Sequence, residues 1–347
     1  MATASAPIRD LVPSLLREYG EATRSILFTY LPRSEPRRYL YDLAADYPLR
    51  GGRAFRPTLC IATARAFGAP IDAAVRTAAS IEMMHNAMLI HDDIEDESEE
   101  RRGRPTMHRN EGVPLAINVG DMLSLLALRP LIDNRALLGP QLAFRILEET
   151  ERMARESAEG QALELGWRRD NVTDVAEADY LAMVLKKTCW LGMIHPSRVG
   201  ALIGSHGDLD ADACIRFGFF LGAAFQIQDD LLNLVGDATA YGKELSGDIW
   251  EGKRTLMLIR LLALAADDEG SRIRHVLSLP RPERSLGDVR WIRSRMDYYD
   301  CIDYARQVAQ GLAGAAHHEF SLLYDHLPDS RDKRFIEALP TWVIERN

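Results

Sequence analysis

Helical periodicity is the feature that most constrains how this chain folds. Apolar residues recur three and four positions apart, as in Ile81, Met84 and Met88, and the stretch 214–225 shows the same spacing. The alternation with a period of two that marks half-buried β-strands is hard to find anywhere in the chain. The sequence therefore predicts an all-α protein, built from segments of helical length.

Glycine and proline divide these segments, since both residues interrupt regular structure. The predicted breaks lie at 51–52, at 103–105, near Gly166, at 205–208, at 236–247 and at 279–284 (LPRPER). We interpret the last of them as a surface loop between two helices rather than an interdomain linker. No solenoid repeat or low-complexity tract is visible. We expect one all-helical domain over residues 1–347, with 1–20 as a candidate flexible N-terminus.

The composition bounds the function. The chain has 347 residues and a formal net charge of −9, which argues against general nucleic-acid binding because that activity usually needs a basic face. Four cysteines are too sparse for a disulfide framework and lack zinc-site spacing, so we expect a cytoplasmic protein. Neither a signal peptide nor a membrane-spanning helix is expected. The four cysteines are Cys60, Cys189, Cys214 and Cys301.

An acidic cluster, HDDIEDESEERRGRPT, follows an apolar helical segment at residues 91–106. On a helix Asp92 and Asp96 share one face, and Asp93 lies at its side. Carboxylates this close repel one another unless a cation joins them, and oxygen ligands suit Mg²⁺. A solvated acidic helix end is the plain alternative. The apolar helix before the aspartates and the pair Arg101 and Arg102 after them favour a site for metal and diphosphate.

A second cluster, FQIQDDLLNLVGD, repeats the spacing at Asp229, Asp230 and Asn233, again at the end of an apolar helix. Burying adjacent carboxylates is costly unless they are compensated. Two such ends therefore favour a metal cluster between facing helices. Downstream, the glycine-rich segment 242–253 carries Lys243 and Lys253 in a loop that can approach a ligand closely.

Basic and polar groups could complete a second phosphate pocket. In RGGRAFRP, residues 50–57, Arg53 and Arg56 lie at a predicted helix start, where guanidinium groups and the helix N-terminus both favour phosphate oxygens. His85 lies two helical turns before Asp92; alone, it would be read as a core histidine. Three further polar residues lie on otherwise apolar helices, where interhelical hydrogen bonding is the plain alternative to a role beside a reacting diphosphate or carbocation. They are one of the adjacent lysines Lys186 and Lys187, together with Thr188 and Gln226.

These motifs together resemble the trans-isoprenyl diphosphate synthases, the polyprenyl synthetase family. GGRAFRP, the HDDIEDESEERRGRPT region, KKT, FQIQDDLLNLVGD and GKELSGDIWEGKRT occur in the family's order, and five motifs in order are specific. The resemblance implies the isoprenoid synthase fold, a single-domain bundle of mostly antiparallel helices around a deep central cavity. It also implies a homodimer, three Mg²⁺ ions per active site, and condensation of isopentenyl diphosphate with an allylic diphosphate.

Residue roles are carried over motif by motif. Asp92, Asp93, Asp96, Asp229 and Asp230 match the two aspartate-rich motifs that bind magnesium. The allylic diphosphate would be gripped by Arg101, Lys187 and Lys243, with help from Lys253. The isopentenyl diphosphate pocket would contain Arg53, Arg56, His85 and Arg102. Thr188 and Gln226 match groups near the reacting carbon.

Two positions depart from the family pattern and one region sets the expected product length. Arg53 replaces the usual lysine and keeps its charge, and Asn233 replaces the third acid of the second motif. The product tail of such enzymes grows beside the helix that carries the first aspartates. With Ala87 at the fifth position before Asp92 and flexible methionines at 84 and 88, we expect geranylgeranyl diphosphate, with twenty carbons, rather than the farnesyl product.

Other readings remain open at this stage. A farnesyl or longer-chain synthase would share every motif. A class I terpene cyclase would share the first aspartate motif but needs no isopentenyl pocket. A non-catalytic regulatory subunit of a synthase would tend to lose one aspartate motif, and both are present.

Overall fold

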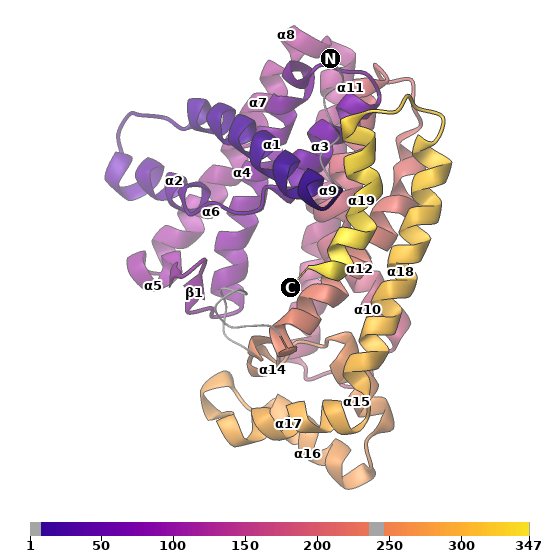
Figure 1. Cartoon of the computed structure of the whole chain (residues 1–347). Coiled ribbons are helices and arrows are strands. Elements are labelled where there is room, and N and C mark those ends of the chain that lie inside the picture. Colours follow the sequence, from indigo (N-terminus) through magenta and orange to yellow (C-terminus); the bar gives the residue numbers. More distant parts are fainter. Residues whose placement is uncertain (1–7, 236–245, 347) are drawn as a thin grey trace.

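The computed structural model describes residues 8–235 and 246–346, which are almost entirely helical (Figure 1). Within that part of the chain the only strand pairing is antiparallel and two residues long, between β1 (Glu100–Arg101) and β2 (Arg104–Pro105). It closes the turn after the first acidic cluster. The prediction of an all-α fold is confirmed.

The first half of the chain contains the long helices α1, α4 and α9 with shorter helices between them. These are α1 (Ile8–Tyr30), η1 (Arg37–Tyr41), α2 (Asp42–Leu49), α3 (Phe55–Ala66), α4 (Ile71–Glu95), α5 (Met107–Glu111), α6 (Val113–Leu126), α7 (Leu128–Asp133), α8 (Arg135–Leu138) and α9 (Pro140–Arg169).

The second half continues the bundle and ends with two long helices. These are α10 (Glu177–Val184), η2 (Leu185–Ile194), α11 (His195–Gly204), η3 (Ala211–Ala213), α12 (Cys214–Val235), α14 (Gly247–Glu251), α15 (Leu256–Leu264), α16 (Asp267–Ser278), η4 (Arg281–Glu283), α17 (Leu286–Tyr298), α18 (Cys301–Tyr324) and α19 (Arg331–Glu345).

Local signals explain where several of these helices begin. The side chains of Thr255, Ser285 and Ser330 accept hydrogen bonds from backbone N–H groups in the first turns of α15, α17 and α19, which satisfies donors that a helix start leaves unpaired. Pro140 lies in the first turn of α9, where its missing N–H costs no hydrogen bond.

Two boundary predictions differ from the structure. The break expected near Gly166 is wrong, because α9 continues through Gly166 to Arg169; a glycine inside a helix costs only about 1 kcal/mol relative to alanine, and the packing of the long helix exceeds that. At the other end, residues 8–20 are helical, and Leu15 and Tyr19 are buried. The loop predicted at 279–284 lies between α16 and α17, as expected.

The core consists of two hydrophobic clusters. One contains buried side chains of α4, α6, η2, α15 and α18, and the other contains buried side chains of α1, α3, α11 and α19. In Figure 1, α18 and α19 lie along one side of the bundle and α16 and α17 lie at its lower end. Helix α4 buries residues on several of its faces and α12 is similarly enclosed, as expected for helices in the middle of a bundle.

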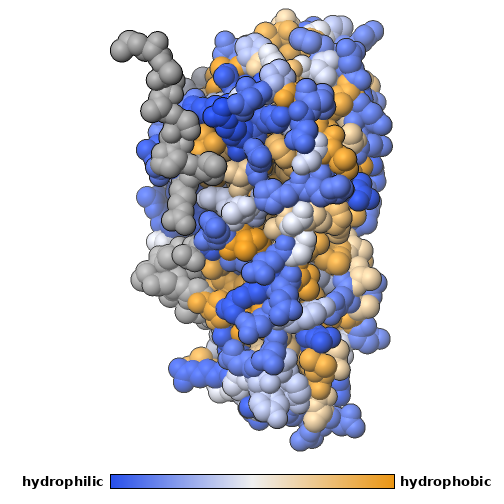
Figure 2. Space-filling view, turned by 45° about the vertical axis from the view of Figure 1, so that its right-hand side comes forward, coloured by the Kyte–Doolittle hydropathy of each residue, from blue (hydrophilic) through white to orange (hydrophobic). Residues whose placement is uncertain are grey.

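The surface mixes hydrophobic and hydrophilic side chains in one region (Figure 2) and exposes several apolar side chains in another. On the face seen in Figure 2, hydrophobic and hydrophilic side chains are interspersed. By length and composition alone, the stretch Val113–Leu138 of α6, α7 and α8 could span a membrane. Of the 18-residue segment on which this rests, 39% is buried inside the protein. Several of its apolar side chains are nevertheless exposed, including Leu125 and Ile132.

Candidate active site

Both aspartate-rich helix ends face one polar cavity of about 170 Å³. Asp92 comes from the end of α4, and Asp229 and Asp230 come from the end of α12. Lys187 of η2 and Lys253, which follows α14, face the same space. Residues separated by more than a hundred positions in the sequence thus meet in one place, with both signs of charge.

A second cavity, of about 500 Å³, shares five lining residues with the first and is lined mostly by apolar atoms. The shared residues are Asp92, Lys187, Thr188, Gln226 and Asp229. Apolar side chains from three elements form much of the remaining wall: Met84, Met88, Leu89, Ala154, Ala158 and Leu191. A polar, charged chamber therefore opens into an apolar one, which is the arrangement an amphiphilic anion requires.

The first aspartate motif is held by basic side chains. Asp92 lies 3.8 Å from the Lys187 ammonium and 3.3 Å from the Arg101 guanidinium. Asp96 accepts hydrogen bonds from Arg168 at 2.5 Å and from Lys253 at 2.8 Å. Burial opposes ionisation of Asp96, but Lys253, Lys187 and Arg168 outweigh it and lower its pKa. Burial and the negative charge of Asp96 oppose ionisation of Asp92. The charges of Lys187, Lys253 and Arg101 outweigh them, so the pKa of Asp92 is also lowered.

Asp93 is placed differently from its neighbours. It is fully buried, accepts a hydrogen bond from the Tyr47 hydroxyl at 2.5 Å, and forms an ion pair with Arg101. Arg101 Nε also donates to it at 2.9 Å. Both carboxylate oxygens therefore already accept hydrogen bonds. These contacts give Asp93 a positioning role, because it fixes Arg101 beside Asp92; its role as a metal ligand stays a prediction.

The second aspartate motif has mostly neutral partners. Asp230 is buried and accepts hydrogen bonds from Tyr180 at 3.0 Å and Gln226 at 2.7 Å. Burial, followed by repulsion from Asp248, raises the pKa of Asp230 well above its usual range. Asp229 is more exposed and accepts a hydrogen bond at 2.6 Å from Arg346, near the C-terminal end.

A close approach of two helices sets the position of Lys187. It lies in η2, a wider, π-type helical segment, and π-type geometry often occurs at functional sites. A Cβ atom at Gly160 of α9 would lie 2.2 Å from the Lys187 backbone nitrogen, so only glycine permits this contact. Lys187 then pairs with Glu164 of α9, while Lys186 turns to Glu156 and Glu159. Of the two adjacent lysines, only Lys187 faces the cavity.

Thr188 and Gln226 form a hydrogen-bonded pair at the junction of the two cavities. The Thr188 hydroxyl donates to the Gln226 carbonyl at 2.7 Å, and the Gln226 amide donates to Asp230. The chain of contacts continues to Tyr180. This network orients the two polar oxygens predicted to lie near the reacting carbon.

The predicted second phosphate pocket is assembled in part. Arg56 Nη1 lies 3.2 Å from His85 Nε2, and both residues line the apolar cavity. Burial, followed by the charges of Arg56 and Arg102, lowers the pKa of His85 well below its usual range, so its ring is neutral. Buried Arg56 Nε and His85 Nδ1 have no hydrogen-bond partner in the structure.

Two other basic residues of this pocket are placed at its edges. Arg102 donates to the Tyr47 carbonyl at 3.1 Å. Arg53 is exposed, with its guanidinium 5.9 Å from the Trp342 ring centroid. Lys253 lies beside Asp96 and lines the polar cavity. Lys243 lies outside the described residues.

The donor set fits magnesium only if the substrate contributes ligands. In the described ranges, no group of three or more His, Cys, Asp or Glu side chains is arranged to hold an ion by itself. Mg²⁺, however, usually keeps several waters and takes one or two carboxylates together with phosphate oxygens. Asp92 and Asp229 both line the polar cavity and are partly exposed, so each can supply such a carboxylate from its own helix.

The three predicted chain-length residues differ in their position relative to the apolar cavity. Met84 and Met88 line the apolar cavity, but Ala87 does not; it is fully buried in the core. Consecutive helical residues are rotated by about 100°, so position 87 lies at the edge of the helix face that carries 84 and 88, and its small side chain packs into the core there. The expectation that Ala87 forms the cavity floor is therefore corrected.

Sequence reasoning missed the residues that hold the aspartates. Tyr47, Tyr180, Glu164, Arg168 and Arg346 all contact predicted site residues. Only Glu164 has a feature that the sequence shows: it lies one helical turn after Gly160. In the structure it pairs with Lys187. A buried tyrosine on a helix has the sequence signature of ordinary core packing, so nothing distinguished the two tyrosines.

Comparison with known proteins identifies the family. The polyprenyl synthetase family model matches residues 38–296. The chain is 31% identical to geranylgeranyl pyrophosphate synthase of Geoglobus acetivorans, covering 97% of this chain and all of that protein. It is 30% identical to geranylfarnesyl diphosphate synthase of Natronomonas pharaonis, covering 97% of this chain and 98% of that protein. The crystal structure of geranylgeranyl pyrophosphate synthetase from Pyrococcus horikoshii is similar, with a TM-score of 0.85 and 31% sequence identity. The match covers 98% of this chain and 99% of that one.

The chain belongs to the polyprenyl synthetase family. Membership confirms the resemblance drawn from the five motifs and the all-α isoprenoid synthase fold. For a polyprenyl synthetase, the polar and apolar cavities have distinct uses: the charged chamber suits a diphosphate and the apolar chamber suits a prenyl tail.

Proposed function

We propose that this protein is a magnesium-dependent trans-prenyltransferase that condenses isopentenyl diphosphate with an allylic diphosphate and releases pyrophosphate. The observation that carries the proposal is the junction of the two cavities, where Asp92, Asp229 and Lys187 lie beside an apolar space. The diphosphate of the allylic substrate would lie in the polar chamber, and its hydrocarbon tail would extend into the apolar one.

Magnesium, when bound, would neutralise the diphosphate and make it a better leaving group. Asp92, Asp96, Asp229 and Asp230 are proposed as its protein ligands, and the family expectation is three ions. Lys187, Lys253 and Arg101 would hold the negative charge that grows on the leaving diphosphate as the carbon–oxygen bond breaks. Lys243 is proposed for the same role.

Isopentenyl diphosphate is proposed to bind beside Arg56, His85 and Arg102, with Arg53 at the exposed edge. Arg56 and His85 line the apolar cavity and contact each other at 3.2 Å, so the Arg56 charge lies where a phosphate could approach it. Its double bond would attack the allylic carbon near Thr188 and Gln226, and a proton would then pass to the departing pyrophosphate. The apolar wall keeps water from the cation.

A product assay tests the proposal. Purified protein is incubated with Mg²⁺, labelled isopentenyl diphosphate and, separately, dimethylallyl, geranyl or farnesyl diphosphate, and the dephosphorylated alcohols are sized. We expect a single elongated alcohol. No elongation from any primer, in a folded protein that binds Mg²⁺, would overturn the assignment. A hydrocarbon made from one diphosphate would instead indicate a terpene cyclase.

Geranylgeranyl diphosphate is the proposed product. Methionines at 84 and 88 form the part of the apolar wall nearest the first aspartates, and their flexible side chains can adapt to a long tail. Met88→Phe should shorten the product because a rigid ring would fill the cavity. Ala87→Phe is the matched control: it should destabilise the core by about 1–3 kcal/mol through overpacking and leave product length unchanged. Unchanged length in Met88→Phe would remove this helix face from length control.

A homodimer is also part of the proposal. Val113, Ile117 and Leu125 of α6 are 44–65% exposed and lie on one face, being four and eight positions apart. Phe144 of α9 is 61% exposed. Exposed apolar groups of this size fit a protein interface. Light scattering should give a dimer for the wild type and a monomer for Leu125→Asp combined with Phe144→Asp, whereas Leu322→Asp on α18 should remain dimeric. A monomeric wild type would refute the proposed homodimer.

Cytoplasmic location completes the proposal. All four cysteines are free and buried, which matches a reducing compartment.

A further inference from the structure

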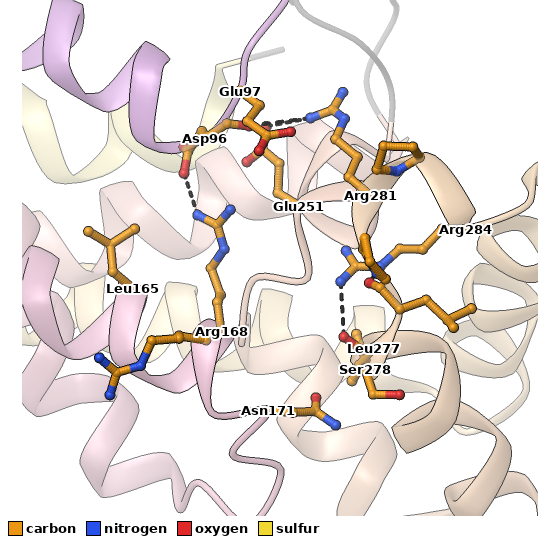
Figure 3. A pocket seen from close by; sticks show the side chains of 14 residues that line it. Asp96, Glu97, Leu165, Arg168, Asn171, Glu251, Leu277, Ser278, Arg281 and Arg284 are labelled. Atoms are coloured by element: carbon orange, nitrogen blue, oxygen red, sulfur yellow. Dashed lines mark hydrogen bonds and ion pairs between the residues drawn. The ribbon is translucent and has the colours of Figure 1, made fainter.

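A third cavity, of about 590 Å³, lies at the end of α9 and shares no lining residue with the two described above (Figure 3). Its walls come from the end of α9, the residues after α4, helix α14 and the loop 279–284 between α16 and α17. Four arginines line it: Arg168, Arg169, Arg281 and Arg284. The catalytic proposal uses none of them.

The carboxylates in this cavity pair with arginines of its own wall, Asp96 with Arg168 and Glu251 with Arg281, and also with a lysine from outside it. Asp96 and Glu251 both line the cavity, and Lys253 pairs with both, at 2.8 Å and 2.6 Å. Glu97 is exposed at the rim. Positive charge therefore exceeds negative charge around the space once Lys253 is included.

Arg284 adds a charge that no described carboxylate balances. Its guanidinium donates only to backbone carbonyls, including those of Leu277 at 2.9 Å and Trp250 at 2.5 Å. Behind it, buried Arg254 donates to backbone oxygens and the Asn171 side chain. Burial, followed by the charges of Arg284 and Arg168, lowers the pKa of Arg254 to about 10.

The remaining wall is apolar. It is formed by Leu165, Leu277, Leu279, Pro280 and Pro282. Arg168 and Arg281 reach in from different walls toward Asp96 (Figure 3): Arg168 donates to its carboxylate at 2.5 Å, and Arg281 Nη1 lies 3.5 Å from its backbone oxygen. The cavity is thus in direct contact with the first aspartate motif while remaining separate from the catalytic chambers.

We propose that this arginine cavity is a second anion site, which binds a diphosphate group. Guanidinium forks match phosphate oxygens in geometry and charge. If the proposed function holds, two sources supply this chemistry: the free pyrophosphate that the reaction releases, and the head group of a prenyl diphosphate whose tail would lie on the apolar wall.

Hydrogen–deuterium exchange can locate the site without relying on catalysis. Protein in EDTA is titrated with sodium pyrophosphate, and exchange is followed in peptides covering 165–171 and 277–284. The test variant is Arg169→Ala with Arg281→Ala, since Arg169 is exposed and bonded only to adjacent Asp170. The matched control is Arg155→Ala, an exposed arginine on the same helix that does not line the cavity.

We expect pyrophosphate to slow exchange in both peptides of the wild type and of Arg155→Ala. The double variant should need at least about tenfold more pyrophosphate, because it lacks two charged donors. Equal protection in the double variant, or protection confined to peptides of the catalytic chambers, would overturn the proposal. These outcomes are independent of the product assay, so a synthase without this site and a site without synthase activity are distinguishable.

A parallel titration separates the two sources. Geranylgeranyl diphosphate that protects 277–284 at a lower concentration than pyrophosphate would support use of the apolar wall by a prenyl tail. Equal concentrations would support recognition of the diphosphate alone. Protection by neither ligand would refute the site.

Discussion

The two aspartate-rich helix ends have the same sequence spacing but opposite electrostatic surroundings. At the end of α4, Asp92 and Asp96 face lysine and arginine side chains, and their pKa values are lowered. At the end of α12, Asp230 faces a tyrosine and a glutamine, and its pKa is raised. A motif therefore specifies where carboxylates lie, whereas their charge depends on partners that come from other helices.

This difference in surroundings affects how strongly each carboxylate depends on a bound cation for its charge. A carboxylate held by cations stays ionised without metal, so the α4 end is pre-organised. A carboxylate held by neutral donors is costly to ionise when buried, so the α12 end gains most from an added cation. We expect the second motif to depend more strongly than the first on bound Mg²⁺ for its charge, and four experiments test the contrast.

The largest effect is expected at Asp92, which faces both catalytic cavities. Asp92→Asn removes a metal ligand and the partner of Lys187 and Arg101, so kcat/KM should fall on the order of 10³-fold, because metal-assisted charge stabilisation supplies several kcal/mol. Steady-state assays measure this. Glu99→Gln, an exposed acid a short distance along the chain, is the control and should change activity less than about twofold. Retention of a tenth of the activity by Asp92→Asn would contradict its assigned role.

Asp93 should matter for stability more than any other aspartate of the two motifs. Asp93→Asn leaves buried Arg101 with only Asp92 as a charged partner, and breaking a buried ion pair costs about 3 kcal/mol or more. Urea denaturation followed by circular dichroism should show the loss. A variant as stable as the wild type would show that Arg101 does not need Asp93.

A smaller effect is expected at the C-terminal end. Arg346 pairs with Asp229 and must give way before a metal binds there. Arg346→Ala should lower the Mg²⁺ concentration for half-maximal activity about fivefold, as expected when an ion pair worth about 1 kcal/mol no longer competes. Arg334→Ala, an exposed arginine on the same helix paired with Asp329, should have no effect. An unchanged or higher requirement in Arg346→Ala would exclude this competition.

The smallest effect on stability is expected at Asp230. An asparagine there removes a buried group that is costly to ionise and can still bond with Tyr180 or Gln226, so Asp230→Asn in EDTA should alter the free energy of unfolding by less than about 1 kcal/mol, or raise it. The comparison with Asp93→Asn is the decisive one: equal destabilisation by both changes would remove the proposed difference between the two helix ends.

The sequence by itself determined the helical fold, the two aspartate-rich helix ends and the family. These properties follow from local spacing: a period of 3.6 residues places apolar stripes and paired carboxylates on faces that can be read directly from the chain. The same reasoning separated neither Lys186 from Lys187 nor Ala87 from Met88 as cavity residues, because each choice depends on how a helix is rotated in the bundle.

Only the tertiary structure decided which partner each functional group has. Tyr47 reaches Asp93, Tyr180 reaches Asp230, Arg168 reaches Asp96 and Arg346 reaches Asp229, across 46 to 117 positions of sequence. Burial and such contacts set the charge state of a carboxylate. They arise from the packing of one helix on another, which no local pattern encodes, and so the electrostatic contrast between two motifs of the same spacing appears only in the folded protein.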